Sequence, residues 1–197
     1  MSKRLFDLVF ASLGLVILSP LLLLMAAWIK SDSTGPVFFR QERVGQYGKT
    51  FRIHKFRTMV TDAEKRGLQI TVGKDSRITR SGAFLRRYKL DELPQLIDVV
   101  IGTMSLVGPR PEVPKYVACY PSDLRDIVLS VKPGITDLAS IEFKDENTLL
   151  GQSDNPEETY IATILPIKLG YYTKYAANNN VWLDFMLIIR TFRAIAS

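Results

Sequence analysis

Residues 5–29 read LFDLVFASLGLVILSPLLLLMAAWI, and this stretch decides the fold because it is almost wholly apolar. Its interruptions are Asp7, Ser12, Gly14, Ser19 and Pro20. A helix needs about 20 apolar residues to cross a bilayer, so the stretch is long enough to be embedded in a membrane. We expect Asp7 to lie at the membrane interface and to pair with Lys3 or Arg4, one turn back.

Three interpretations of this stretch compete. A secretory signal peptide would also begin with basic residues, but the apolar run is too long and no clean cleavage site follows it. A helix that spans the bilayer is the ordinary alternative. The third interpretation is a re-entrant helix, which dips into the membrane and returns to the same face.

The Ser19-Pro20 pair favours the re-entrant helix. Pro20 removes a backbone donor and its ring presses against the carbonyl of Val16, so it kinks the helix. The Ser19 hydroxyl can satisfy a freed carbonyl where no water is available. The positive-inside rule places both flanks in the cytoplasm, because both are basic: Lys3, Arg4, Lys30, Arg40 and Arg43. We therefore predict a re-entrant membrane helix over residues 1–30.

Composition narrows the classes of function. The formal net charge is +6 and the isoelectric point is near 9.4, which indicates anionic partners: membrane lipid, nucleic acid or a phosphorylated substrate. Cys119 is the single cysteine, so no intramolecular disulfide can form and a reducing, cytoplasmic setting fits. His54 is the single histidine, which excludes zinc sites built on several His or Cys ligands.

Residues 31–197 combine short strands with longer helices, so the predicted fold class is α+β and predominantly helical. A small β-hairpin is expected from strands over 37–44 and 50–56 around the turn at 45–48. Helices are expected over 61–66, 81–89, 156–175 and 181–196. The helix over 81–89 is basic and amphipathic, so it lies at the membrane interface or exposes a solvated basic face.

Two further segments are expected to be irregular. Lys132-Pro133-Gly134-Ile135-Thr136 has the proline and glycine of a type II turn at its centre. Residues 145–155 are polar and are expected at the surface.

Asp91 and Glu92 stand side by side in an otherwise apolar segment. Adjacent carboxylates repel each other, so cations or a metal ion must balance them. Apolar residues follow at helical spacing: Leu93, Leu96, Ile97 and Val100. They predict a helix with Asp91 as N-cap and Pro94 in its first turn, where anions are favoured. The alternative is a capped amphipathic helix whose charges are solvated.

Arg110 lies between Pro109 and Pro111. The two prolines restrict the backbone around it, so its guanidinium is presented from a stiff loop. Such an arginine suits bidentate recognition of a phosphate. The alternative is a structural proline loop with an arginine at the surface.

The motifs together resemble those of the bacterial sugar transferase family. They are the apolar start with Ser19-Pro20, Lys55-Phe56-Arg57-Thr58-Met59, Leu90-Asp91-Glu92-Leu93-Pro94-Gln95 and Gly108-Pro109-Arg110-Pro111. More narrowly, the chain is similar to the small monotopic phosphoglycosyl transferases, the minimal form without the extra transmembrane helices of larger relatives. The resemblance covers nearly the whole chain, and the motifs occur in the expected order.

This resemblance implies a reaction. Such enzymes transfer a phospho-sugar from a UDP-sugar to polyprenyl (undecaprenyl) phosphate, giving polyprenyl diphosphate sugar and UMP. The step commits a bacterial glycoconjugate to the membrane. By the same resemblance, residues 31–197 form a membrane-associated catalytic domain on the cytoplasmic face of the inner membrane. A homo-oligomer is possible, and no nucleic acid takes part.

The resemblance also implies roles for single residues. Asp91 would be the nucleophile that carries a phospho-sugar intermediate, and it would also hold Mg²⁺. Glu92 would be its partner carboxylate, which either assists proton transfer from the acceptor or positions the acceptor. The substrate-binding residues would be Lys55, Arg57, Arg86, Arg110 and Glu112, and the membrane helix would break at Ser19 and Pro20.

One segment departs from the family pattern. After Pro133-Gly134-Ile135-Thr136, many members continue with Gly, an apolar residue, Ala and Gln, whereas this chain has Asp137-Leu138-Ala139-Ser140. The departure bears on the choice of sugar and nucleotide rather than on the reaction. An alternative from another class is a non-catalytic membrane-anchored protein that binds anions or lipid through its basic face.

Overall fold

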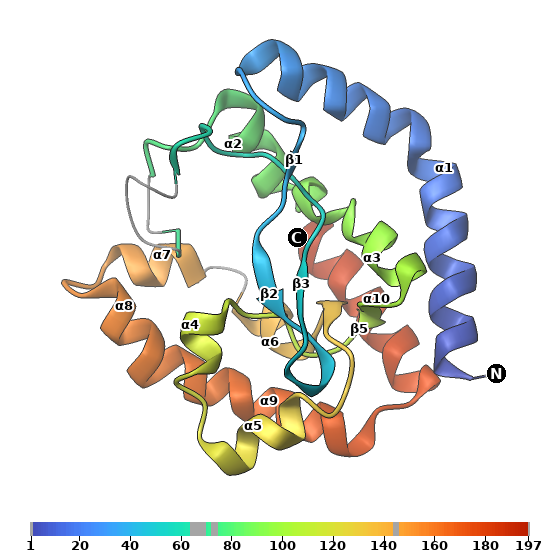
Figure 1. Cartoon of the computed structure of the whole chain (residues 1–197), viewed down its shortest axis with the longest axis vertical. Coiled ribbons are helices and arrows are strands. Elements are labelled where there is room, and N and C mark those ends of the chain that lie inside the picture. The colour runs from blue at the N-terminus through green and yellow to red at the C-terminus, as the bar shows by residue number, and fades with distance from the viewer. Residues whose placement is uncertain (1, 64–69, 72–74, 144–145, 197) are drawn as a thin grey trace.

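The computed structural model describes residues 2–63, 70–71, 75–143 and 146–196. Within these ranges the chain is mostly helical and its strands form small two-stranded sheets, which confirms the α+β class. Helix α1 (Lys3–Asp32) arches around the other elements along the right and upper edges of Figure 1. Part of the helix expected over 61–66 and the first residue of the stretch 145–155 lie outside the described residues.

Helix α1 is continuous over 30 residues although Pro20 lies inside it. The side chain of Ser2 caps its first turn by accepting a hydrogen bond from the Leu5 N–H at 3.3 Å. The Ser19 hydroxyl donates to the Val16 carbonyl at 2.8 Å, so the carbonyl that faces the proline ring keeps a partner. In Figure 1 the helix changes direction along its length, as a proline inside a helix leads one to expect.

By length and composition, α1 is the one helix among the described residues that could cross a membrane. The mean hydropathy of its most apolar window is 2.6, and 11% of that window is buried. Most of its apolar surface therefore faces away from the rest of the chain.

The N-terminal end of α1 is fastened to the globular part by cations. Lys3 Nζ lies 2.5 Å from the carboxylate of Asp184 and donates to the Val107 carbonyl at 3.1 Å. The Arg4 guanidinium donates to two carbonyls within helix α3 (Gln95–Ile101) at 2.6 and 2.8 Å. These charges therefore hold the first turn of the helix against distant segments.

The expected pairing of Asp7 with Lys3 or Arg4 is wrong. Its side chain is buried, and Oδ1 accepts a hydrogen bond from the Leu106 N–H at 3.1 Å. Lys3 and Arg4 are not its partners because both turn toward carbonyls and a carboxylate of the globular part. Asp7 therefore contributes to the attachment of α1 to the globular part.

The C-terminal end of α1 is also held by the globular part. Asp32 accepts hydrogen bonds from the backbone N–H and the hydroxyl of Ser81, at 2.8 and 2.7 Å, next to the start of helix α2 (Arg80–Arg87). The Arg57 guanidinium donates to carbonyls of the segment that leaves the helix, among them that of Ser33 at 2.8 Å. Both ends of α1 thus lie on one body, with an exposed apolar arch between them.

The predicted hairpin is present but interrupted. Its inner part pairs β2 (Glu42–Val44) with β3 (Thr50–Arg52), and its outer part pairs β1 (Phe38–Phe39) with β4 (Lys55–Phe56), both antiparallel. At the turn Tyr47 has a φ of 58° and Gly48 one of 75°. Glycine adopts the left-handed region at no steric cost, which suits it to this turn.

Helices make up most of the remaining chain. After the short 3₁₀ turn η3 (Leu90–Glu92) and α3, they are α4 (Pro114–Val117), α5 (Ser122–Val128), α6 (Leu138–Glu142), α7 (Glu146–Gly151), α8 (Pro156–Thr159), the π-helical turn η4 (Tyr160–Ile164), α9 (Leu165–Asn178) and α10 (Val181–Ala196). The helices predicted over 81–89 and 181–196 are therefore confirmed. The polar stretch 145–155 contains a helix, α7, because Leu150 is fully buried and anchors it.

The helix predicted over 156–175 is present with a change of winding. The π turn η4 ends two residues before Pro166, which has no N–H to offer the carbonyl four residues back. The Leu165 N–H reaches the carbonyl of Tyr160, five residues back, and this widens the turn. The wider turn brings Tyr160 to the interior, where it is 1% exposed.

The type II turn expected at Gly134 is wrong. Gly134 begins strand β6 (Gly134–Thr136), which pairs in parallel with β5 (Ser105–Val107), and it is not among the glycines with positive φ. A Cβ at Gly134 would lie 2.0 Å from the backbone nitrogen of Gly108. The glycine is therefore required by close contact between two backbones rather than by a turn.

Apolar packing joins the arch to the helices beneath it. In its N-terminal half Ala11 packs with Leu96 and Val99 of α3. In its C-terminal half Met25 and Ile29 pack with Phe56 and Leu85. Each large side chain buried this way contributes about 1.5–3 kcal/mol. A separate core holds the C-terminal helices together: Tyr116, Tyr160, Ile164, Leu165, Leu169 and Tyr172.

Candidate active site

A cavity of about 1390 Å³ opens among α1, the hairpin, α2, η3 and the C-terminal helices. Basic side chains gather on its wall: Arg40, Arg43, Lys55, Arg86, Arg87, Lys89, Arg110 and Lys168. Asp91 and Glu92 line the same cavity, as do apolar residues of α1 such as Phe10, Leu18 and Leu21. The cavity thus joins a strongly charged centre to the inner face of the apolar arch.

The two adjacent carboxylates lie in the 3₁₀ turn η3. The turn begins after Lys89, which adopts left-handed backbone angles (φ 56°, ψ 20°) and reverses the chain at the end of α2. Asp91 and Glu92 are 2% and 9% exposed. The expectation that Asp91 caps the following helix is wrong, because α3 begins at Gln95 after Pro94 and has no side-chain cap.

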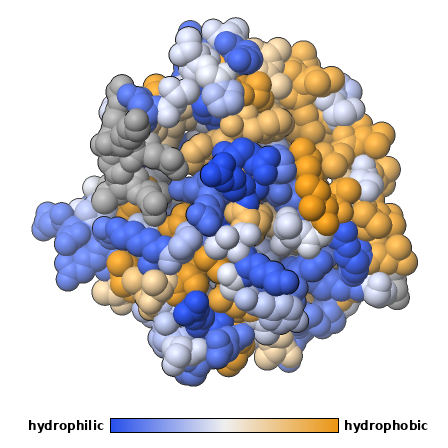
Figure 2. All heavy atoms as spheres, viewed as in Figure 1, coloured by the Kyte–Doolittle hydropathy of each residue, from blue (hydrophilic) through white to orange (hydrophobic). Residues whose placement is uncertain are grey.

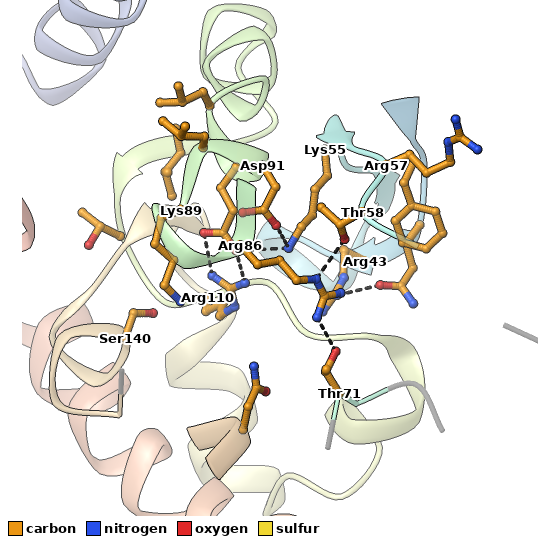
Figure 3. Close-up of a pocket in the computed structure, with 18 of the residues that line it drawn as sticks. Arg43, Lys55, Arg57, Thr58, Thr71, Arg86, Lys89, Asp91, Arg110 and Ser140 are labelled. Atoms are coloured by element: carbon orange, nitrogen blue, oxygen red, sulfur yellow. Dashed lines mark hydrogen bonds and ion pairs between the residues drawn. The ribbon is translucent and has the colours of Figure 1, made fainter. Parts of the chain in front are cut away.

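Lys55 of β4 balances both carboxylates. Its Nζ lies 2.8 Å from Asp91 Oδ2 and 3.3 Å from Glu92 Oε1 (Figure 3). This is the cation that adjacent carboxylates need, and it comes from a strand 36 residues earlier in the chain than Asp91 (91 − 55). Since the Lys55 side chain is 21% exposed, the pair remains open to the cavity.

Arg110 makes a two-pronged contact with Glu92. Its Nη1 donates to Oε2 at 3.2 Å, and its Nη2 donates to Oε1. Burial alone would raise the pKa of Glu92, but Arg110 and Lys55 outweigh it and hold that pKa well below the usual range. The same contact with Glu92 raises the pKa of Arg110 well above its ordinary value. The Pro-Arg-Pro loop therefore presents a guanidinium that is already oriented by a carboxylate.

Arg86 of α2 extends the basic wall. Its guanidinium donates to the Thr58 hydroxyl at 2.9 Å and to the Thr71 hydroxyl at 2.7 Å (Figure 3). Burial lowers the pKa of Arg86, and the charge of Asp91 opposes this effect. The guanidinium is thus fixed by neutral hydroxyls and lies within the influence of the Asp91 charge.

Two residues expected to bind substrate have other contacts in the structure. The terminal nitrogens of Arg57 donate to the carbonyls that follow α1, because Arg57 is 4% exposed and turned toward that end. Glu112 accepts a hydrogen bond from the Tyr160 hydroxyl at 2.6 Å and lies 3.6 Å from Arg43 Nη1. Both line the cavity, and the contacts shown connect Arg57 to the end of α1 and Glu112 to Arg43 and Tyr160.

Sequence reasoning missed one residue of the cavity wall and one residue that contacts the wall from outside it. Lys168 lines the cavity from α9 and forms an ion pair with Glu146. The sequence could have indicated this residue, because Lys168 is three or four positions from Ile164, Leu165 and Tyr172 and therefore shares their buried helix face. His54 was missed as well: its Nδ1 lies 2.7 Å from Asp98 and its Nε2 2.6 Å from Arg40, and no local pattern announces that contact.

The model of the bacterial sugar transferase family matches residues 1–197. The chain belongs to the bacterial sugar transferase family. Within it the chain is 40% identical, over 96% of its length, to a UDP-glucose:undecaprenyl-phosphate glucose-1-phosphate transferase of Klebsiella pneumoniae. It is 35% identical, over 98% of its length, to a UDP-N-acetylgalactosamine-undecaprenyl-phosphate N-acetylgalactosaminephosphotransferase of Aeromonas hydrophila.

The length of these relatives differs from that of the chain. The chain covers 39% of the Klebsiella protein and 43% of the Aeromonas protein. It covers 92% of the exopolysaccharide production protein PSS of Rhizobium leguminosarum bv. phaseoli, to which it is 35% identical over 96% of its own length. The family therefore includes proteins much longer than this chain and others of similar length.

Proposed function

We propose that the protein transfers a phospho-sugar from a UDP-sugar to polyprenyl phosphate and releases UMP. The observation that carries this proposal is a single cavity with three features. It contains the carboxylates Asp91 and Glu92, it contains their cationic partners Lys55 and Arg110, and it is bounded by the inner face of α1. The names of the relatives support both substrates, since they give a UDP-sugar as donor and undecaprenyl phosphate as acceptor.

The geometry suits a two-step transfer through Asp91. In the first step the Asp91 carboxylate attacks the phosphorus that bears the sugar, the bond to the bridging oxygen breaks, and UMP leaves with that oxygen. In the second step an oxygen of polyprenyl phosphate attacks the same phosphorus and frees Asp91. The product is polyprenyl diphosphate sugar, and each step forms one P–O bond while breaking another.

The basic residues have distinct tasks in this proposal. Lys55 exchanges its contact with Asp91 for a contact with the donor phosphates, which frees the nucleophile. Arg110 and Arg86 neutralise phosphate charge from fixed positions, and positioning plus neutralisation is most of what phosphoryl transfer requires. Glu92 orients Arg110 through the two-pronged contact. Arg57 and Glu112 act indirectly. Arg57 holds the end of α1, and Glu112 fixes Arg43 and Tyr160.

The residues present fit a Mg²⁺ ion. Among the described residues there is no group of three or more His, Cys, Asp or Glu that could form a cage for a metal. Mg²⁺ does not need one, because it ordinarily binds one or two carboxylates, substrate phosphates and several waters. Asp91 would hold it together with the donor diphosphate. When bound, it would supply further neutralisation of the charge on the phosphates.

The same proposal places α1 in the membrane as a re-entrant helix and residues 31–197 on the cytoplasmic face. Both ends of α1 are attached to one body, which supports a helix that enters and leaves the membrane at the same face. Apolar surface gathers over α1 at the right and upper right of Figure 2. Its exposed members include Val16, Ile17, Leu23 and Leu24.

The alternative of a non-catalytic anion- or lipid-binding protein is not supported. The family match covers the whole chain, and the relatives with named activities are sugar-phosphate transferases. A purely lipid-binding protein also has no use for two buried carboxylates in a basic cavity.

The test measures UMP release from purified protein with Mg²⁺, undecaprenyl phosphate and a panel of UDP-sugars. We expect UMP from at least one donor, and a phospho-sugar adduct on Asp91 when the acceptor is withheld. Turnover without any adduct would replace the two-step route by direct attack of the acceptor. No UMP from any donor, together with no donor-induced rise in thermal stability, would exclude the proposed function.

A further inference from the structure

The cavity has a second polar wall that the proposed reaction does not use. It is formed by α6, α7 and α9, and its polar residues are Ser140, Glu146, Asn147 and Lys168. In the view of Figure 3, Ser140 lies on the opposite side of Arg110 from Thr71. We call these four residues the second wall.

Lys168 is the buried charge of the second wall. It is 4% exposed, forms an ion pair with Glu146, and its Nζ lies 5.0 Å from the centroid of the Tyr160 ring. An ammonium group has three N–H donors, and the carboxylate and the ring face occupy two of these directions. The remaining direction is available to a hydroxyl group of a bound molecule.

Ser140 is held so that it presents an acceptor. Asp137 caps α6 and accepts hydrogen bonds from the Ser140 N–H at 3.0 Å and from its hydroxyl at 2.5 Å. Because the hydroxyl hydrogen is engaged, the lone pairs of Ser140 Oγ face outward. Asn147 adds an exposed amide, which both donates and accepts.

The second wall is connected to the charged centre through the protein. Glu112 accepts from the Tyr160 hydroxyl at 2.6 Å, and the ring of Tyr160 lies beneath Lys168. Because Arg110 and the second wall line the same cavity, a molecule whose phosphates contact Arg110 can extend along this wall without leaving the cavity. The wall carries one positive and one negative side chain, which compensate each other.

We propose that the second wall binds the sugar of the donor and that its Lys168–Glu146 pair selects a neutral sugar over one that bears a carboxylate. The inference rests on the proposed function and names the substrate class of that same site. The hydroxyl groups of a neutral sugar can pair with the hydrogen-bond donors and acceptors of the second wall. A carboxylate on the sugar would be repelled by Glu146. It would gain little from Lys168, because Glu146 already compensates the charge of that lysine. A site that hydrogen-bonds hydroxyls discriminates strongly, since its polar groups are left unpaired by the wrong ligand.

The experiment compares Lys168→Met with Lys115→Met in the full chain. Lys115 is a matched control, because it also pairs with a glutamate, Glu157, and lies 5.9 Å from the Tyr116 ring, but it is exposed and does not line the cavity. For each protein we would measure the KM for the neutral UDP-sugar that the wild type uses and the inhibition constant of UMP, which lacks the transferred sugar. Donor discrimination would be the ratio of kcat/KM for that sugar to kcat/KM for UDP-glucuronate.

We expect Lys168→Met to raise the KM for the UDP-sugar about tenfold, the effect of one lost hydrogen bond to a bound ligand, and to leave UMP inhibition unchanged. Lys115→Met should change neither constant. Glu146→Gln should lower the preference for the neutral donor over UDP-glucuronate at least about fivefold, because it leaves the charge of Lys168 uncompensated.

Two results would overturn the inference while the wild type is active. One is an equal change in the constants for UMP and UDP-sugar in Lys168→Met, and the other is no change in either. If the melting transition shows that Lys168→Met does not fold, Asn147→Ala is tested instead, because the Asn147 side chain is exposed. This variant should raise the KM for the UDP-sugar and leave the inhibition constant of UMP unchanged. If the wild type releases no UMP from any donor and no donor raises its thermal stability, the proposed function fails and this inference fails with it.

Discussion

Two clusters, each with positively and negatively charged side chains, connect distant parts of the chain. They differ in whether they line the cavity. The cavity cluster consists of Lys55, Asp91, Glu92 and Arg110, and it lines the cavity. The docking cluster consists of Lys3, Tyr175 and Asp184; the Tyr175 hydroxyl lies 2.7 Å from Asp184 Oδ1, and none of the three residues lines the cavity.

The comparison distinguishes charges that remain accessible from the cavity from charges that are buried within the fold. In the cavity cluster the cations remain 21–29% exposed, so a phosphate can reach them. In the docking cluster the Asp184 carboxylate is fully buried and both its oxygens are engaged. The same substitution should therefore affect turnover in one cluster and stability in the other.

The largest effect is expected for Asp91→Asn. An amide cannot serve as the nucleophile, so UMP release should fall at least about 10³-fold, or ~4 kcal/mol of barrier. The melting temperature should stay close to that of the wild type, because Lys55 keeps its contact with Glu92. Activity and thermal denaturation of the same preparation measure both effects. Turnover at the wild-type level would remove Asp91 from the chemistry.

The corresponding change in the docking cluster, Asp184→Asn, should lower the free energy of unfolding by about 3 kcal/mol, because it leaves Lys3 without a buried counter-charge. Turnover per folded molecule should remain within about twofold of the wild type. Denaturant unfolding in detergent measures the stability. Asp123→Asn, at an exposed position on α5, is the matched control and should change stability by less than about 0.5 kcal/mol. A catalytic loss in Asp184→Asn without loss of stability would contradict the division between the clusters.

A smaller effect is expected for Arg110→Lys. Lysine keeps the charge but loses the fork that contacts both oxygens of Glu92, so kcat/KM should fall about 30-fold. Arg125→Lys, an exposed change on α5, should have no effect. If Arg110→Lys retained full kcat/KM, the charge of Arg110 alone would be sufficient and its orientation by Glu92 unimportant.

The smallest effect concerns pH. Because the folded pKa of Glu92 lies below its ordinary value of 4.5, its ionised form stabilises the fold above pH 4.5, and this contribution is lost as the pH falls through the folded pKa. The difference in unfolding free energy between wild type and Glu92→Gln should therefore be constant from pH 7 to about 5 and shrink below 4.5. A difference that already declines between pH 7 and 5 would show that the pKa is not lowered.

Much of the architecture follows from local pattern. The apolar helix, the hairpin, the basic helix near residue 85 and the last helix were all predictable, because spacing and turn residues act over a few positions. The π turn before Pro166 and the helix α7 were not, since they depend on a missing N–H and on the burial of Leu150. The role of Gly134 was misjudged because a close contact between two backbones looks like a turn in sequence.

For the site, the sequence by itself determined which charges exist and that Asp91 and Glu92 need cations, because adjacent carboxylates repel each other in any fold. Only the tertiary structure decided which cations pair with these two carboxylates. Lys55 and Arg57 stand two positions apart, yet Lys55 contacts the carboxylates and Arg57 the end of α1. The physical reason is that a long charged side chain takes whichever buried partner the packing brings within reach, and those partners come from segments far away in the chain.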